Sequence, residues 1–168
     1  MSFFNPKNPK SKIVVSLVMA TFITGISCQP HGFLVIAIPI IIMLIWIPYS
    51  VYVIIRKPDL RVNQLSRVGI WIVAVFIVTG FHFELAKSTK RSADEIVLAI
   101  DNYTKKFGHC PAQLEDLGLN RTQLKAKLGM SGYYCNNGKP SLFYVSTYTI
   151  GDTNVYNFEK KVWEYQPD

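Results

Sequence analysis

Charged side chains are nearly missing from three long stretches in the first half of this 168-residue sequence. Ile13–Cys28 and Phe33–Ile55 contain none, and Val68–Leu85 contains only Glu84, close to its end. A bilayer core about 30 Å thick needs about 20 apolar residues of helix, so each stretch predicts a membrane-spanning helix. Ionisable groups are also missing at mid-membrane depth, which argues against a carrier or pump, because transport usually needs such groups there.

The basic residues predict how these spans are oriented. Three lysines precede the first stretch, none lies between the first and second, and four basic residues fall within Arg56–Arg67. Because lysine and arginine are retained on the cytoplasmic side, the N terminus is expected inside and everything after Leu85 outside. We therefore predict a three-helix membrane domain over residues 1–86, with spans at about 13–28, 33–55 and 68–86, and an exported domain over residues 87–168.

The first stretch has a second interpretation as a cleaved targeting signal, because basic residues precede it and small residues lie before Cys28. The next apolar stretch follows after only a few residues, which favours a retained helix.

The net charge of +7 does not indicate a nucleic-acid partner. Seven of the 18 lysines and arginines lie in the two segments predicted to face the cytoplasm, where anionic lipid attracts them. Residues 87–168 are close to neutral, with eleven basic and nine acidic side chains. The predicted partners are therefore the lipid bilayer and a protein, but not nucleic acid.

Histidine is scarce, with three in the chain, and the exported part contains only His109. No Ser/His/Asp or Cys/His arrangement can be assembled from it, so we predict no catalytic residues, no cofactor and no metal, and hence a protein that is not an enzyme. We interpret two acidic pairs, Asp94-Glu95 and Glu115-Asp116, as residues of helix N-terminal turns, where the helix dipole stabilises carboxylates.

The remaining ionisable groups of the membrane part lie toward its outer side. His31, His82 and Glu84 are the candidates for a polar site at the membrane interface, although His82 and Glu84 are two residues apart and so cannot share one helical face. A metal-dependent enzyme that uses the outer histidines is the enzymatic alternative.

The exported part begins with a predicted amphipathic helix over Ser92–Phe107, whose apolar stripe is Ile96, Ile100, Tyr103 and Phe107, widened by Val97 and Ala99. No proline or glycine separates it from the third span, so the two form one long helix or pause at Lys87–Arg91. A short turn is expected over Pro111–Gly118, and Asn120 caps a helix that runs to Leu128.

The texture changes after residue 132 to short aromatic and β-branched runs separated by turn residues. This pattern predicts an antiparallel meander of three or four strands, and the sheet must bury one face against the preceding helix. The fold class is therefore three transmembrane helices plus a small α+β domain. The expected strands are Tyr133–Cys135, Leu142–Ile150, Val155–Phe158 and Val162–Tyr165.

Cys110 and Cys135 both fall in the exported domain, whose small core would gain from a covalent link. A loop of about 25 residues predicts roughly 3 kcal/mol of stabilisation from a disulfide between them. Cys28 is left unpaired.

Aromatic side chains are dense in the predicted sheet, and about half of them should point away from the helix, because strand residues alternate between faces. Exposed aromatic rings are common anchors in protein interfaces. The candidate partner-binding residues are Tyr144, Tyr148, Tyr156, Trp163 and Tyr165.

The segment Ala93–Tyr103 followed by Phe107–Gly118 resembles the exported part of type IV pilins and type II secretion pseudopilins. In that family an amphipathic helix leads from a membrane span through a glycine, a proline and a short turn into an antiparallel sheet. The resemblance covers about the last 85 residues and implies a bacterial inner-membrane protein with a periplasmic pilin-like domain. The helix that enters this domain is the third span, which does not fit leader processing or extraction into a filament.

Two non-enzymatic functions follow. The first is recognition or assembly, in which the exported domain docks a pilus or secretion component. The second is immunity against a secreted toxin that acts at the inner membrane or in the periplasm. The oligomeric state is open.

Overall fold

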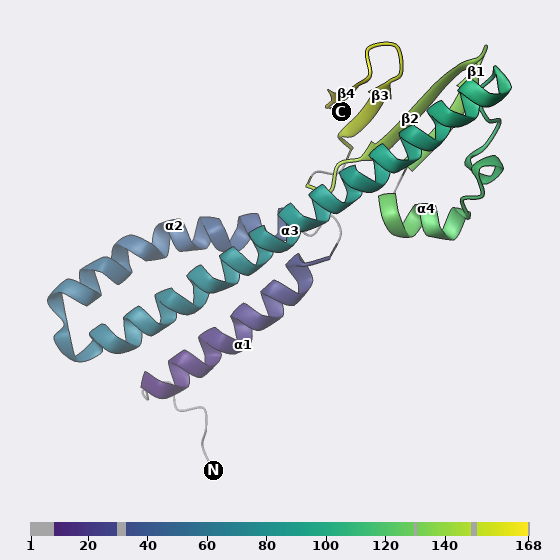
Figure 1. Ribbon diagram of the computed structural model, residues 1–168. Helices are drawn as coiled ribbons and strands as arrows, with labels where there is room; N and C mark the ends of the chain where they lie inside the picture. Colours follow the sequence, from purple (N-terminus) through teal and green to yellow (C-terminus); the bar gives the residue numbers. More distant parts are fainter. Residues whose placement is uncertain (1–8, 30–32, 130, 149–150, 168) are drawn as a thin grey trace. The chain divides into compact units, whose positions relative to one another are not determined.

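The computed structural model describes residues 9–29, 33–129, 131–148 and 151–167 (Figure 1). The chain divides into two compact units, Met1–His82 and Phe83–Asp168. Its helices and strands follow the order α1, α2, α3, η1, α4, β1, β2, β3, β4.

Three helices form in the first half of the chain: α1 (Pro9–Ser27), α2 (Phe33–Arg56) and α3 (Pro58–Phe107). Lys57 separates α2 from α3, because a residue before proline is pushed out of the helical region while Pro58 is favoured in a first turn. α3 is unbroken for 50 residues. Of the two sequence alternatives for Lys87–Arg91, the continuous helix is therefore confirmed.

Polar side chains connect the three helices inside the first unit. Gln64 of α3 donates to the hydroxyl of Ser50 on α2 at 2.7 Å, and Nε of Arg67 donates to Ser16 of α1 at 3.1 Å. The Arg67 guanidinium also lies 5.1 Å from the ring centroid of Trp46, a cation–π arrangement. These contacts fix how α1, α2 and the first part of α3 face one another.

The burial pattern of this unit is the reverse of that in a water-soluble bundle. Polar residues are prominent among the buried positions, whereas many large apolar side chains are exposed. The buried polar residues include Ser16, Ser27, Ser50, Gln64 and His82, and the exposed apolar ones include Val18, Phe22, Leu44, Ile45 and Phe76.

Among the helices in the described part of the chain, α3 alone is long and apolar enough to cross a membrane. The described apolar segments of the other two, Ser11–Ser27 and Met43–Arg56, are shorter than a span usually requires. The prediction of three spans is thus supported for one helix, and only the coarser description, a long apolar helix with an α+β domain, is confirmed.

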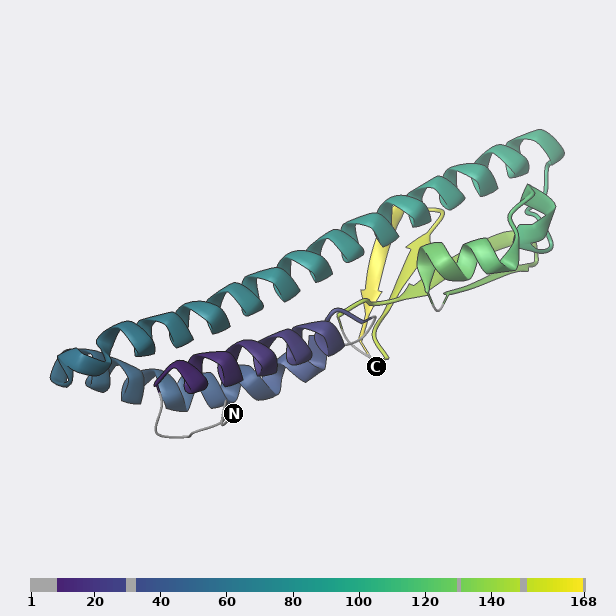
Figure 2. The ribbon, with the colours of Figure 1, turned by 90° about the horizontal axis from the view of Figure 1, so that it is seen from below.

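The second unit has its core between α3 and the sheet. Ala93, Ile96, Val97 and Ile100 of α3 are buried, in one cluster with Leu142 of the sheet. Figure 2 shows this part of α3 lying along the sheet. The cluster is completed by Leu114, Leu124, Leu128 and Tyr144.

The predicted apolar stripe is buried at Ile96 and Ile100, as expected, but its last residue, Phe107, is exposed. Tyr103 is half-buried and Phe107 is 51% exposed. Phe107 lies in the last turn of α3, just before Gly108, and its ring contacts Tyr103 at a centroid distance of 4.5 Å.

The sheet is the predicted antiparallel meander, with strands in the order β1-β2-β3-β4. The first hairpin turns at Asn137 and Gly138, both at positive φ (51° and 76°), as a two-residue type I′ turn requires. The second strand ends earlier than predicted, at Val145, and the expected end at Ile150 lies outside the described residues. The strands are β1 (Ser131–Asn136), β2 (Lys139–Val145), β3 (Thr153–Asn157) and β4 (Val162–Gln166).

Two short helices lead from α3 into the sheet. The turn predicted after Pro111 is the 3₁₀ helix η1 (Leu114–Leu117), which ends at Gly118 with φ 75°. The helix α4 (Arg121–Leu128) begins as predicted at Asn120, whose side chain accepts a hydrogen bond from the Thr122 backbone N–H at 2.9 Å. Both helices place leucines in the core.

Candidate functional site

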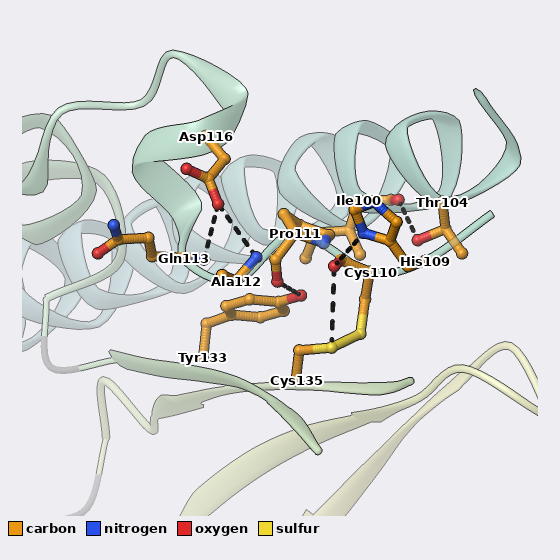
Figure 3. Close-up of a disulfide and its surroundings, with 10 residues drawn as sticks. All are labelled: Ile100, Thr104, His109, Cys110, Pro111, Ala112, Gln113, Asp116, Tyr133 and Cys135. Carbon is orange, nitrogen blue, oxygen red and sulfur yellow. Dashed lines mark hydrogen bonds between the residues drawn. A yellow bond between two sulfur atoms is a disulfide. The ribbon is translucent and has the colours of Figure 1, made fainter. Parts of the chain in front are cut away.

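A disulfide joins Cys110, in the loop after α3, to Cys135 on β1 (Figure 3). The two Cα atoms are 6.1 Å apart, and this confirms the predicted pair. Cys28 is the free cysteine. The bond links the end of α3 to the first strand of the sheet. Both ends of the segment between them, which contains η1 and α4, are therefore held in place.

Hydrogen bonds hold the rest of this loop beside the disulfide. The Tyr133 hydroxyl donates to the carbonyl oxygen of Pro111 at 2.9 Å. The Asp116 carboxylate accepts from the backbone N–H groups of Ala112 and Gln113 at 3.0 and 3.1 Å, as predicted for a carboxylate in a helix N-terminal turn (Figure 3). These hydrogen bonds connect residues 111–113 to η1 through Asp116 and to β1 through Tyr133.

Tyr133 is held in its neutral form by this environment. Burial first, and then the nearby Asp116 carboxylate and Tyr103, together raise the pKa of its phenol to about 12. A neutral phenol keeps its proton for the Pro111 carbonyl, so the hydrogen bond persists over the whole physiological pH range.

Four of the five predicted partner-binding residues lie on the helix-facing side of the sheet, and three of these belong to its core or pack against it. Tyr144 is 7% exposed and belongs to the core, while Tyr156 and Trp163 pack against that core. The Trp163 ring contacts Tyr144 and Tyr156 at centroid distances of 5.1 and 5.0 Å. Burial, and then Asp94, raise the pKa of Tyr144. Tyr144 is therefore a core residue, contrary to the prediction that it anchors a partner.

Asp94 takes part in this packing, which corrects its predicted role. Its Oδ1 accepts a 2.7 Å hydrogen bond from the indole N–H of Trp163. Because α3 begins at Pro58, Asp94 lies deep within a helix and not in an N-terminal turn.

The other two predicted residues are more accessible. Tyr165 is 59% exposed, and its hydroxyl is hydrogen-bonded to Asp152. Tyr148 is half-buried, and its backbone N–H donates to the Ser146 hydroxyl at 3.2 Å.

The side of the sheet that faces away from α3 carries a second apolar surface, here called the outer face. Cross-strand partners share a face of a sheet, so the pairs Gly132–Phe143, Phe143–Val155 and Asn157–Val162 define it. Tyr134 is 55% exposed there and Val162 is 46% exposed. The apolar residues of the outer face are Gly132, Tyr134, Phe143, Val145, Val155 and Val162, and the register also places Ser141, Asn157 and Glu164 on it.

Glycine at position 132 shapes this face. A Cβ atom there would lie 2.3 Å from the Phe143 ring, so the ring covers the Gly132 backbone directly. Beside it is a cavity of about 870 Å³, lined by Phe143 and Val145 of the sheet together with Leu124 and Lys125 of α4. The outer face therefore combines exposed rings with a hollow.

The sequence predicts that about half of the rings face away from the helix, but the candidates named for partner binding are not the residues of the outer face. Tyr133 and Tyr134 are adjacent in one strand and must point to opposite faces, and so must Phe143 and Tyr144. Tyr133 is half-buried and Tyr144 is buried, both on the helix-facing side. Tyr134 and Phe143 therefore lie on the outer face.

The polar residues predicted at the membrane interface differ in their surroundings. His82 is fully buried, with Nε2 2.7 Å from the carbonyl oxygen of Ser27, whereas Glu84 is exposed. His31 lies outside the described residues. Within the part of the chain that the structure describes, no group of three histidine, cysteine, aspartate or glutamate side chains could hold a metal ion.

Comparisons with protein-family models, with curated proteins and with solved structures found no match to this chain. A long helix on a small antiparallel sheet occurs in more than one class of protein.

Proposed function

We propose that this chain is a bacterial inner-membrane protein that presents a disulfide-linked, pilin-like periplasmic domain for the recognition of another protein. The observation that carries this proposal is the outer face, where Tyr134 on β1 and Val162 on β4 are exposed and the Phe143 ring covers Gly132. Contiguous apolar surface with aromatic rings is characteristic of protein interfaces. The resemblance to pilins suggests a pilus or secretion assembly as the setting.

The membrane part of the proposal has three spans, with the N terminus in the cytoplasm. It is supported by the reversed burial pattern of the Met1–His82 unit, in which Phe22, Leu44 and Phe76 are exposed while Ser50 and Gln64 are buried. Exposed apolar side chains are unfavourable in water but suit lipid, and polar contacts between helices help a membrane bundle to pack.

The test is site-specific photo-crosslinking in intact cells, with a benzophenone side chain at Tyr134 or Val162 of the full-length protein. We expect both positions to trap the same protein. Phe107, which is also exposed but lies on α3, is the control position and should not trap it. Adducts with lipid alone, or identical adducts from the control position, would contradict the proposal.

A pair of matched variants then links the trapped protein to the outer face. Phe143→Asp places a charge in this face and should abolish the adduct from Val162. Leu98→Asp makes the same change at an exposed apolar position of α3 and should leave the adduct intact. Formation of the Cys110–Cys135 disulfide in both variants would show that the domain still folds.

Immunity is the alternative that uses the same surface, with a toxin as the trapped protein. The identity of the adduct separates the two functions: a pilus or secretion component supports assembly, and a toxin encoded by a neighbouring gene supports immunity.

A further inference from the structure

A second cavity, of about 550 Å³, lies in the Phe83–Asp168 unit, away from the outer face. Four residues of α3 line one side of it: Phe83, Ala86, Lys87 and Lys90. Tyr148 and Tyr165 are among the residues that line the other side. The cavity therefore joins a strongly apolar segment of helix to two positive charges and three phenol rings, the third being that of Tyr144.

The two lysines are placed to act together. Lys87 and Lys90 are three residues apart on α3 and so lie on one side of the helix. Within the described part of the chain, the ion pairs involve other lysines, at positions 105, 127, 139 and 160. The charges of Lys87 and Lys90 are thus not neutralised by a carboxylate in an ion pair.

The carboxylates around the cavity have other hydrogen-bond donors. Asp94, one helical turn beyond Lys90, accepts from the indole of Trp163. Asp152 is hydrogen-bonded to the hydroxyl of Tyr165. The lining of the cavity itself contains two lysines and no carboxylate, and this suits an anion.

The rest of the lining indicates an anion that is also amphiphilic. The cavity wall is mostly apolar, and Phe83 at its edge is 61% exposed. The apolar stretch of α3 ends at Leu85, so the lysines follow directly after the segment proposed to cross the membrane. Tyrosine rings and lysine stems are favoured at this depth, and lysine binds phosphate as a point charge.

We propose that this cavity binds the phosphate group of an anionic phospholipid of the outer leaflet. Lys87 and Lys90 pair with the phosphate, and Phe83 and Ala86 contact the first carbons of the lipid chains. The lipid as source depends on the membrane orientation proposed above, whereas the phosphate chemistry depends only on the cavity.

The first experiment titrates the full-length protein in detergent micelles with phosphatidylglycerol or phosphatidylcholine and counts bound lipid by native mass spectrometry. We expect one phosphatidylglycerol per chain, bound about tenfold more tightly than phosphatidylcholine. Lys87→Gln combined with Lys90→Gln should remove this preference. Lys105→Gln combined with Lys106→Gln, on the same helix but away from the cavity, should keep it. An unchanged preference in the first double variant would overturn the proposal.

The second experiment distinguishes a lipid from a soluble phosphate compound. Acetylation of Lys87 and Lys90 is followed by mass spectrometry in the presence of phosphatidylglycerol or of inorganic phosphate. Protection by the lipid at low mole fraction identifies the lipid as the source. Protection by millimolar inorganic phosphate alone supports a phosphate site with a soluble ligand. Protection by neither would overturn the site.

One further variant separates the apolar contribution from the charges. Phe83→Ser should weaken phosphatidylglycerol binding but leave protection by inorganic phosphate unchanged.

The site and the proposed function can fail separately. Micelles impose no orientation, so a C terminus found in the cytoplasm would contradict the proposed function without affecting these measurements. Equal binding of phosphatidylglycerol and phosphatidylcholine by the wild type would contradict the lipid site. Crosslinking from Tyr134 would still test the proposed function.

Discussion

The indole N–H of Trp163 donates a 2.7 Å hydrogen bond to Oδ1 of Asp94, 69 residues earlier in the chain. The bond connects the last strand of the sheet to the middle of α3. Because the same indole ring packs against Tyr144 and Tyr156, one side chain both fills the space under the helix and sets the position of β4 along it.

Removing this hydrogen bond should loosen β4. Trp163→Phe keeps a ring but loses the donor. We expect a loss of about 1.5 kcal/mol in the free energy of unfolding, the lower end of the range for a charged acceptor, because this pair is exposed. Asp94→Ala should cost a similar amount, and the double variant little more than either single one. Hydrogen exchange of the β4 amides in the full-length protein measures the effect. Strictly additive losses would show that the two side chains do not interact.

The disulfide should contribute more than any single hydrogen bond in the Phe83–Asp168 unit. Cys110→Ser should lower its stability by roughly 3 kcal/mol, because the bond closes a 25-residue loop. Thiol alkylation followed by non-reducing electrophoresis should find Cys110 and Cys135 protected and Cys28 labelled. Cys28→Ser, the matched control, should leave stability unchanged. Labelling of all three thiols in oxidising conditions would contradict this.

Tyr133 should make the Phe83–Asp168 unit sensitive to strongly alkaline pH. Its pKa is about 12 in the folded protein and about 10 in an unfolded chain, so the unfolded state releases this proton first. The contribution of Tyr133 is fully present below pH 10 and is lost as the pH rises toward 12. Tyr133→Phe removes this dependence. The difference in absorbance titration near 295 nm between wild type and variant should show one phenol with a midpoint near pH 12, and a midpoint near 10 would refute the assignment.

The orientation of the chain can be tested with reporter fusions. Fusions after Lys12, Gln29, Arg61 and Asp168 should report inside, outside, inside and outside, because basic residues are retained in the cytoplasm. A fusion after Asp168 that reports inside would refute the exported location of the C-terminal domain, and one after Gln29 that reports inside would refute the first hairpin.

Local chemistry was sufficient to predict much of the Phe83–Asp168 unit. The α4 helix begins at Asn120 because the amide side chain accepts a hydrogen bond from a backbone N–H that the helix itself leaves unpaired. The meander follows from short β-branched and aromatic runs, and the Asn137-Gly138 turn joins its first two strands because both residues tolerate positive φ. The disulfide was predictable because Cys110 and Cys135 fall in one small domain whose core would gain from a covalent link.

The sequence alone therefore determined the apolar stretches, the helix and strand types, the caps and the cysteine pair, since each depends on residues close together in the chain or on composition. Only the tertiary structure decided which rings are buried. Tyr144, Tyr156 and Trp163 face α3 while Tyr134 and Phe143 form the outer face, because the choice depends on strand register and on which side of the sheet the helix covers. The same long-range packing gave Asp94 its indole partner, which no local pattern of carboxylates reveals.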